Sequence, residues 1–104
     1  MVTHTILFSF PDEMSQADRD EFFREGTVMA LESGLVLSYA HQASIQLPTH
    51  VEPAFVPSAM AQIRYADVAS LQRYLTHPPV GEFVQRWRAK FPYRAVSVNT
   101  EDWS

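Results

Sequence analysis

The chain has 104 residues, a length that predicts one domain over residues 1–104, and its 46% hydrophobic and 12% aromatic content is typical of a globular protein. Eight Lys and Arg residues stand against twelve Asp and Glu residues, so the net charge of −4 argues against nucleic-acid binding and against a polybasic membrane surface. The absence of cysteine excludes disulfides, thiol catalysis and cysteine-bound metals.

Residues 2–10 alternate as a strand with one buried face does, and His4 lies on the apolar side with Val2, Ile6 and Phe8. The segment has neither a basic leader nor a small-residue cleavage site, so we expect a strand rather than a signal peptide, and a cytoplasmic location. No apolar run approaches the roughly 20 residues that a membrane span requires.

A helix is predicted from the N-cap Ser15 to Glu32, because Asp18 follows the cap by three residues and Gly34 suits the position after the helix end. Residues 35–46 then alternate as a second strand, which places Tyr39 and His41 on the same face. The pattern leaves open whether that face meets the helices or a partner sheet.

The segment 47–57 contains three prolines, which exclude regular structure and predict a lid or interface loop. Residues 58–65 alternate as a third strand. Asp67 caps a short helix, and Pro78 and Pro79 end it and begin another that finishes near Lys90. Residues 93–99 form the last predicted strand, and an acidic tail follows at 100–104.

This order of elements predicts an α+β, ferredoxin-like βαββαβ sandwich with an extra short helix before the last strand. Its antiparallel sheet of four strands would carry helices on one face. The other face would be bare and weakly polar, and such a surface on a small domain favours self-association. We therefore expect a homodimer that closes two sheets face to face, as a dimeric α+β barrel.

Three segments carry a resemblance to a known family: residues 4–10 (HTILFSF), 21–23 (EFF) and 71–78 (LQRYLTHP) followed by Phe83. With them the chain resembles the stress-responsive α/β-barrel (Dabb) domain family, whose members include polyketide cyclases of the olivetolic acid cyclase type. The resemblance spans residues 2–99, with the exception of the proline-rich loop. It implies a dimeric fold, a pocket between sheet and helices, and acid–base chemistry without metal or organic cofactor.

Carried over position by position, the first-strand histidine of these cyclases matches His4 and their helix tyrosine matches Tyr74. Their second catalytic histidine, just after the His-Pro dipeptide, falls on Val80. A further histidine on the third strand falls on Ala59. The chain therefore keeps one of the two catalytic histidines, and the resemblance implies a substrate or reaction step that differs from that of the cyclases.

Each candidate residue also has a structural interpretation. His4 is either a base or a satisfied core histidine, and Tyr74 either binds a ligand or only packs. Arg64 either binds a carboxylate or enolate or pairs with an acid at the dimer interface, and His77 either serves the site or hydrogen-bonds at a helix end. The predicted catalytic residues are His4 and Tyr74, and the predicted substrate-binding residues are Tyr39, His41, Arg64, His77, Val80, Phe83 and Trp87.

The four histidines lack metal-ligand spacing, and no phosphate-binding glycine loop or nucleophile motif is present. The first functional hypothesis is a cofactor-independent enzyme of cyclase or lyase type that acts on a small hydrophobic carbonyl, polyketide-like or phenolic molecule. One alternative is a non-catalytic, stress-related or ligand-binding oligomer. Another, based on fold analogy, is a cofactor-free monooxygenase.

Overall fold

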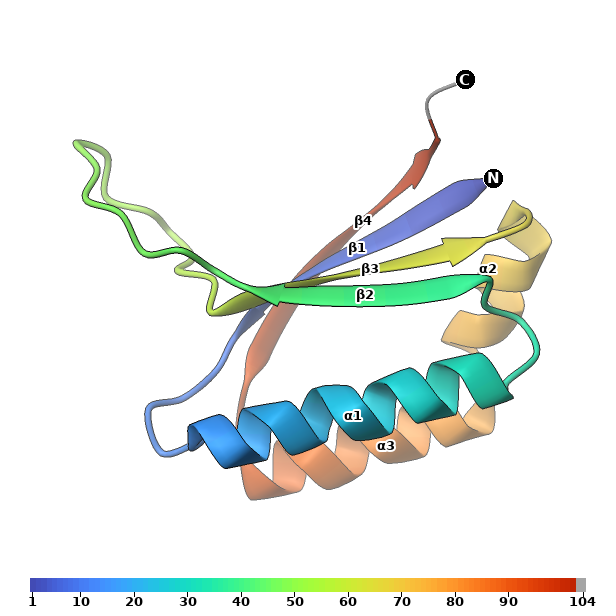
Figure 1. The fold of residues 1–104 in the computed structure, drawn as a ribbon, viewed down its shortest axis with the longest axis horizontal. Helices are drawn as coiled ribbons and strands as arrows, with labels where there is room; N and C mark the ends of the chain where they lie inside the picture. The colour runs from blue at the N-terminus through green and yellow to red at the C-terminus, as the bar shows by residue number, and fades with distance from the viewer. Residues whose placement is uncertain (103–104) are drawn as a thin grey trace.

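The computed structural model describes residues 1–102. They form β1 (Val2–Ser9), α1 (Gln16–Glu32), β2 (Ser38–Ala43), β3 (Ala59–Tyr65), α2 (Val68–Leu75), α3 (Pro78–Lys90) and β4 (Arg94–Glu101). Within these residues the strands make one antiparallel sheet of four strands in the order β2-β3-β1-β4, and the helices lie against one of its faces (Figure 1). This is the predicted α+β, ferredoxin-like arrangement, with α2 and α3 both placed between β3 and β4.

The helix boundaries follow from their caps. The Ser15 side chain accepts a hydrogen bond from the Asp18 backbone N–H, 3.1 Å away, and α1 begins at the next residue. Beyond its C-cap, Gly34 adopts φ +74°, a left-handed conformation that glycine takes without strain. Asp67 caps α2 in the same way through the Ser70 backbone N–H, at 2.8 Å. These starts and the glycine end were all predicted from the residue types.

Two strand boundaries differ from the prediction. The second strand was expected over 35–46, but β2 spans 38–43, because it pairs only with β3, from Ser38 opposite Arg64 to Ala43 opposite Ala59. The last strand was expected over 93–99, but β4 spans 94–101. It continues beside β1 to the point where Glu101 lies opposite Val2, so residues 100 and 101 belong to the sheet. Pairing partners set both limits, and alternation along one segment does not reveal them.

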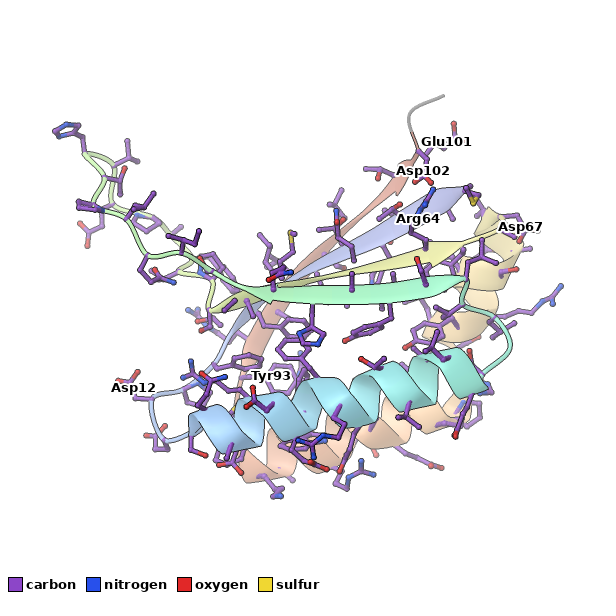
Figure 2. All side chains as sticks on the ribbon, in the orientation of Figure 1. Asp12, Arg64, Asp67, Tyr93, Glu101 and Asp102 are labelled. Carbon is purple, nitrogen blue, oxygen red and sulfur yellow. The ribbon has the colours of Figure 1, made fainter. Side chains whose placement is uncertain are left out.

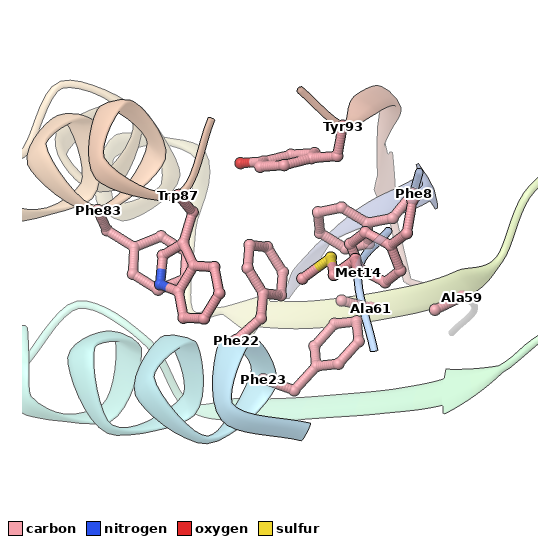
Figure 3. Packing of buried hydrophobic residues seen from close by; sticks show 10 residues of the cluster. Phe8, Met14, Phe22, Phe23, Ala59, Ala61, Phe83, Trp87 and Tyr93 are labelled. Atoms are coloured by element: carbon pink, nitrogen blue, oxygen red, sulfur yellow. The ribbon is translucent and has the colours of Figure 1, made fainter. Parts of the chain in front are cut away.

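Aromatic side chains fill the space between one end of the sheet and the helices α1 and α3 (Figure 3). The Phe22 ring is central: its centroid lies 5.3 Å from that of Phe8, 5.4 Å from that of Trp87 and 5.3 Å from that of Tyr93, each in an edge-to-face arrangement. A second cluster packs under α2 at the other end of the sheet and consists of Val2, Ala30, Ile63, Tyr65, Leu71 and Tyr74.

The opposite face of the sheet carries no helix among the described elements (Figure 1). We call it the open face, and it presents Thr3, Thr5, Leu7, Gln62, Arg64, Val96 and Val98. The 44–58 connection between β2 and β3 extends away from the body of the molecule (Figure 1), and its Ile45 and Leu47 side chains are exposed. The Arg94 guanidinium on the open face lies 5.5 Å from the Phe55 ring centroid and so contacts this segment.

Candidate functional site

A cavity of about 450 Å³ lies between the sheet and the helices, where the two core clusters meet. The strands contribute His4, Tyr39 and Ile63 to its wall, and the helices contribute Gly26, Tyr74 and Phe83. Its lining holds no Asp, Glu, Lys or Arg side chain from the described residues. The polar groups that face it are an imidazole, phenol hydroxyls and the Gln85 amide, so it suits a neutral and largely apolar ligand.

His4 is oriented by a neighbour on the next strand. Its side chain is 7% exposed, and Nδ1 lies 2.5 Å from Oδ1 of Asn99, which is its register partner on β4. An amide oxygen accepts hydrogen bonds, so Nδ1–H is the donor in this pair. A neutral imidazole then keeps its lone pair on Nε2, which is the nitrogen available to a molecule in the cavity.

The phenols of Tyr39, Tyr74 and Tyr93 surround the same cavity. Burial raises the pKa of Tyr74 to about 12. Burial also raises the pKa of Tyr39, and the nearby Tyr74 and Tyr93 phenols add to that shift. For Tyr93, burial raises the pKa, while Arg88 acts in the opposite direction. All three are therefore uncharged near neutral pH and offer a hydroxyl that can donate a hydrogen bond.

The structure brings together five of the residues predicted for the site: His4, Tyr39, Tyr74, Val80 and Phe83 all line this cavity. It also shows which face carries Tyr39 and His41, because both side chains point toward the helices. His41 nevertheless stays outside the cavity wall, since its ring stacks on Phe23 with 4.4 Å between centroids.

His77 and Trp87, also predicted for the site, do not line this cavity. His77 is the N-cap residue of α3 and makes no side-chain capping bond. Trp87 is 2% exposed in the aromatic cluster, and its indole N–H donates a 2.9 Å hydrogen bond to Glu25 on α1. That bond, with a smaller contribution from Arg86, lowers the pKa of Glu25, although desolvation opposes the shift. The pair ties α3 to α1 beside the cavity.

Arg64 lies on the open face, on the other side of the sheet from the cavity. Its guanidinium pairs with the carboxylate of Asp102, and Nε lies 3.1 Å from Oδ2 (Figure 2). The Thr3 hydroxyl donates to the same carboxylate at 2.5 Å. Arg64 thus pairs with an acid of its own chain, and the geometry separates it from His4.

Sequence reasoning missed Asn99, Tyr93 and Gly26. Asn99 matters because it lies opposite His4, and only the β1–β4 register shows this. Tyr93 was taken as the first residue of a strand, whereas its 5%-exposed ring lies just before β4 and faces the core. Gly26 lies inside the helix predicted to end at Glu32, and nothing in the local pattern indicates that its Cα side faces the cavity.

Within residues 1–102, no group of three His, Asp or Glu side chains is arranged to hold a metal ion. In the same part of the chain, no helix combines the length and the apolar character that a bilayer crossing requires.

The architecture is shared with several solved structures. At3g17210 from Arabidopsis thaliana superposes with a TM-score of 0.85 at 13% identity, covering 100% of this chain and 97% of that one. A Dabb family protein with a ferredoxin-like fold from Mesorhizobium loti has a TM-score of 0.75 at 18% identity, covering 99% of this chain and 97% of that one. The hydroxynitrile lyase from Passiflora edulis has a TM-score of 0.77 at 15% identity, covering 99% of this chain and 96% of the lyase.

Two further solved structures share the fold. A cofactor-independent oxygenase from Streptomyces nogalater and a dimeric ferredoxin-like protein from Thermobifida fusca have TM-scores of 0.68 and 0.73, each at 14% identity. No protein-family model matches the chain, and no curated protein sequence matches it. At these identities the likeness establishes the ferredoxin-like fold.

Proposed function

We propose that the chain is a single-domain member of the stress-responsive α/β-barrel family and that its cavity binds a small, neutral, hydrophobic carbonyl or phenolic molecule. His4 and Tyr74 then carry out acid–base chemistry of cyclase or lyase type on that molecule. One observation carries the proposal: the His4 ring is fixed through Nδ1 by Asn99, so that Nε2 is free in an apolar cavity lined by uncharged phenols.

The residues have separate roles in such a reaction. Nε2 of His4 accepts a proton from a phenol or from the carbon beside a carbonyl group, and Nδ1–H···Oδ1 of Asn99 holds the ring that becomes positively charged. The Tyr74 hydroxyl donates a hydrogen bond to the oxygen on which negative charge develops. Since Val80 occupies the position of the second cyclase histidine, His4 both takes the proton and returns it, and neither step uses a cofactor.

The fold neighbours support chemistry of this class. One is a hydroxynitrile lyase and another is a cofactor-independent oxygenase, so small-molecule reactions occur on the same architecture. The oxygenase supports the cofactor-free monooxygenase as a weaker alternative. The replacement of the second histidine by Val80 favours a different alternative, a stress-related or ligand-binding oligomer without catalysis.

The proposed partner is a second copy of the chain. The open face exposes Val96 and Val98 at the edge of an uncovered sheet, and a fold neighbour is described as a dimeric ferredoxin-like protein. Two such faces in contact would bury these side chains and leave both cavities on the outer, helix-covered sides. The net charge of −4 still argues against nucleic acid or an anionic membrane as partner.

The test is proton exchange on a neutral aromatic ketone, 4′-hydroxyacetophenone, in D₂O, followed by the loss of its methyl signal in NMR spectra. We expect the wild type to catalyse the exchange and His4→Ala to lower the rate by about 10²-fold or more. Tyr74→Phe should lower it as well. His41→Ala is the matched control, because it removes a histidine on the same sheet face but outside the cavity.

Equal exchange by wild type and His4→Ala would contradict the catalytic role. Ligand-induced stabilisation that requires His4, without exchange, would favour the ligand-binding alternative instead. Oxygen uptake with an anthrone-like phenol, lost in His4→Ala, would favour the monooxygenase.

A further inference from the structure

Gly26 is buried in the interior of α1, where glycine is less favourable than alanine. Two side chains from other elements use the space that its missing Cβ leaves. A Cβ atom at position 26 would lie 3.3 Å from the Tyr39 hydroxyl oxygen and 3.4 Å from Cζ of Phe83. The first of these distances is tighter than ordinary van der Waals contact, so a side chain at position 26 would push the hydroxyl aside by a few tenths of an ångström.

The hydroxyl of Tyr39 is free to meet a ligand. Tyr39 lines the cavity, and burial keeps its phenol protonated. Among residues 1–102, the Tyr65 hydroxyl is the one buried side-chain hydroxyl that has no hydrogen-bond partner. The Tyr39 hydroxyl is not enclosed in this way, so a ligand in the cavity can reach it. Tyr74 lies near enough to raise the pKa of Tyr39. Tyr39 on β2 and Tyr74 on α2 both line the cavity, so two phenol donors from different elements face it.

We propose that Gly26 is a specificity-determining residue, whose missing side chain lets the Tyr39 hydroxyl stand in the cavity and donate a hydrogen bond to the carbonyl oxygen of a neutral aromatic ligand. The inference rests on the proposed function, because it assumes that the cavity binds such a ligand. It adds two points. Tyr39 is a second hydrogen-bond donor to the ligand beside Tyr74, and the absence of a side chain at Gly26 of α1 sets the position of the Tyr39 hydroxyl.

Gly81 supplies a matched control. It also lines the cavity and lies within a helix, α3, but a Cβ atom there would meet nothing within 4 Å. Gly81→Ala therefore adds a methyl group to the same cavity without touching Tyr39. Tyr39→Phe supplies the second control, because it removes the 3.3 Å contact with the hydroxyl oxygen. The contacts that remain for a Cβ at position 26 are then with Cζ of Phe83, at 3.4 Å, and with Cζ of residue 39, at 3.9 Å.

The probe is prodan, a neutral naphthyl ketone whose fluorescence shifts to longer wavelength when its carbonyl accepts a hydrogen bond. We expect bound prodan to emit at longer wavelength in the wild type than in Tyr39→Phe. Gly26→Ala should weaken binding about tenfold and shift the emission toward that of Tyr39→Phe, as loss of one hydrogen bond predicts. Gly81→Ala should resemble the wild type, and Gly26→Ala should change the Kd by less than about twofold in the Tyr39→Phe background.

Thermal unfolding without ligand gives an independent measurement. Alanine favours a helix interior over glycine, so Gly81→Ala should raise the Tm. Gly26→Ala should raise it in the Tyr39→Phe background and fail to raise it when the Tyr39 hydroxyl is present.

The outcomes separate the two proposals. Unchanged prodan affinity and emission in Gly26→Ala would overturn the inference and leave the proposed function standing. If Gly26→Ala does not fold, unchanged emission in Tyr39→Phe would overturn it equally. Failure of the wild type to bind prodan at all would contradict the proposed ligand class, and the inference with it.

Discussion

The two faces of the sheet are built from alternate residues of the same strands, yet they have different environments. On β1, Val2, His4 and Phe8 are buried against the helices, whereas Thr3 and Thr5 lie on the open face. The helix-covered face holds the aromatic cluster and the cavity. The open face holds small, polar and aliphatic side chains and the Arg64–Asp102 pair.

This contrast separates two physical tasks. Burial of large aromatic side chains removes much apolar area from water, and it stabilises the monomer wherever helices cover the sheet. The open face contributes little to the fold of one chain, because water still reaches its side chains. Its apolar side chains can contribute fully to stability only when another surface covers them. Substitutions on the helix-covered face should therefore change the free energy of unfolding, and substitutions on the open face should change dimer assembly.

The largest expected effect is on the helix-covered face. Phe22→Ala removes a 2%-exposed ring that contacts Phe8, Trp87 and Tyr93, and it should lower the free energy of unfolding by about 3–5 kcal/mol. Chemical denaturation measures it. Leu31→Ala in the same helix is the control: it truncates a 51%-exposed side chain and should change stability by about 0.5 kcal/mol or less. Similar losses for both variants would refute the assignment of the core to this face.

The second effect concerns assembly. Val96→Asp places a charge on the open face, twice in a symmetric dimer, and should raise the dimer dissociation constant by about 100-fold or more. Sedimentation at several concentrations measures it. Val28→Asp on α1 is a matched control, because Val28 is 49% exposed and Val96 is 48% exposed. A monomeric wild type, or dissociation caused equally by both substitutions, would contradict association through the open face.

The smallest effect concerns pH. The Thr3 hydroxyl, and after it the Arg64 guanidinium, hold the pKa of Asp102 below its ordinary value of 3.8. Since the folded-state pKa is the lower one, the contribution of this carboxylate is complete above about pH 4 and is lost as the pH falls through the lowered value. The Tm of wild type should exceed that of Asp102→Asn near neutral pH, and the difference should shrink below about pH 4.

Asp12→Asn is the control for this titration, because Figure 2 shows Asp12 at the other end of the molecule from Arg64. The Tm of Asp12→Asn, compared with that of wild type, should not show the narrowing that is expected for Asp102→Asn. A Tm difference between wild type and Asp102→Asn that stayed constant down to pH 3 would show that this ion pair does not make stability depend on pH.

Sequence patterns were sufficient for much of the fold because they report local physics. The caps Ser15 and Asp67 and the left-handed Gly34 follow from what those side chains do to the nearest backbone groups. Alternation predicted which face of β1 is buried. The true length of β2 and the extension of β4 to Glu101 escaped prediction, because a strand ends where its partner ends.

The residues of the candidate site likewise fall into those that the sequence predicted and those that only the structure revealed. Residue type and family resemblance predicted His4 and Tyr74 as its chemical groups, and the structure places both on one cavity with Tyr39, Val80 and Phe83. Arg64 was grouped with them from its residue type, and the pleat directs it to the other side of the sheet. Asn99 escaped because 95 residues separate it from His4 in the chain.

By itself, then, the sequence determined the order of elements, the buried side of the first strand, the helix caps and the candidate chemical groups, which are the His4 imidazole and the Tyr74 phenol. These depend on interactions over a few residues, where side-chain chemistry and backbone preference act directly. Only the tertiary structure decided that Asn99 orients His4, that Gly26 makes room for the Tyr39 hydroxyl and that Arg64 faces away. Those relations depend on strand register and on the packing of α1 against β2, which arise when distant segments meet.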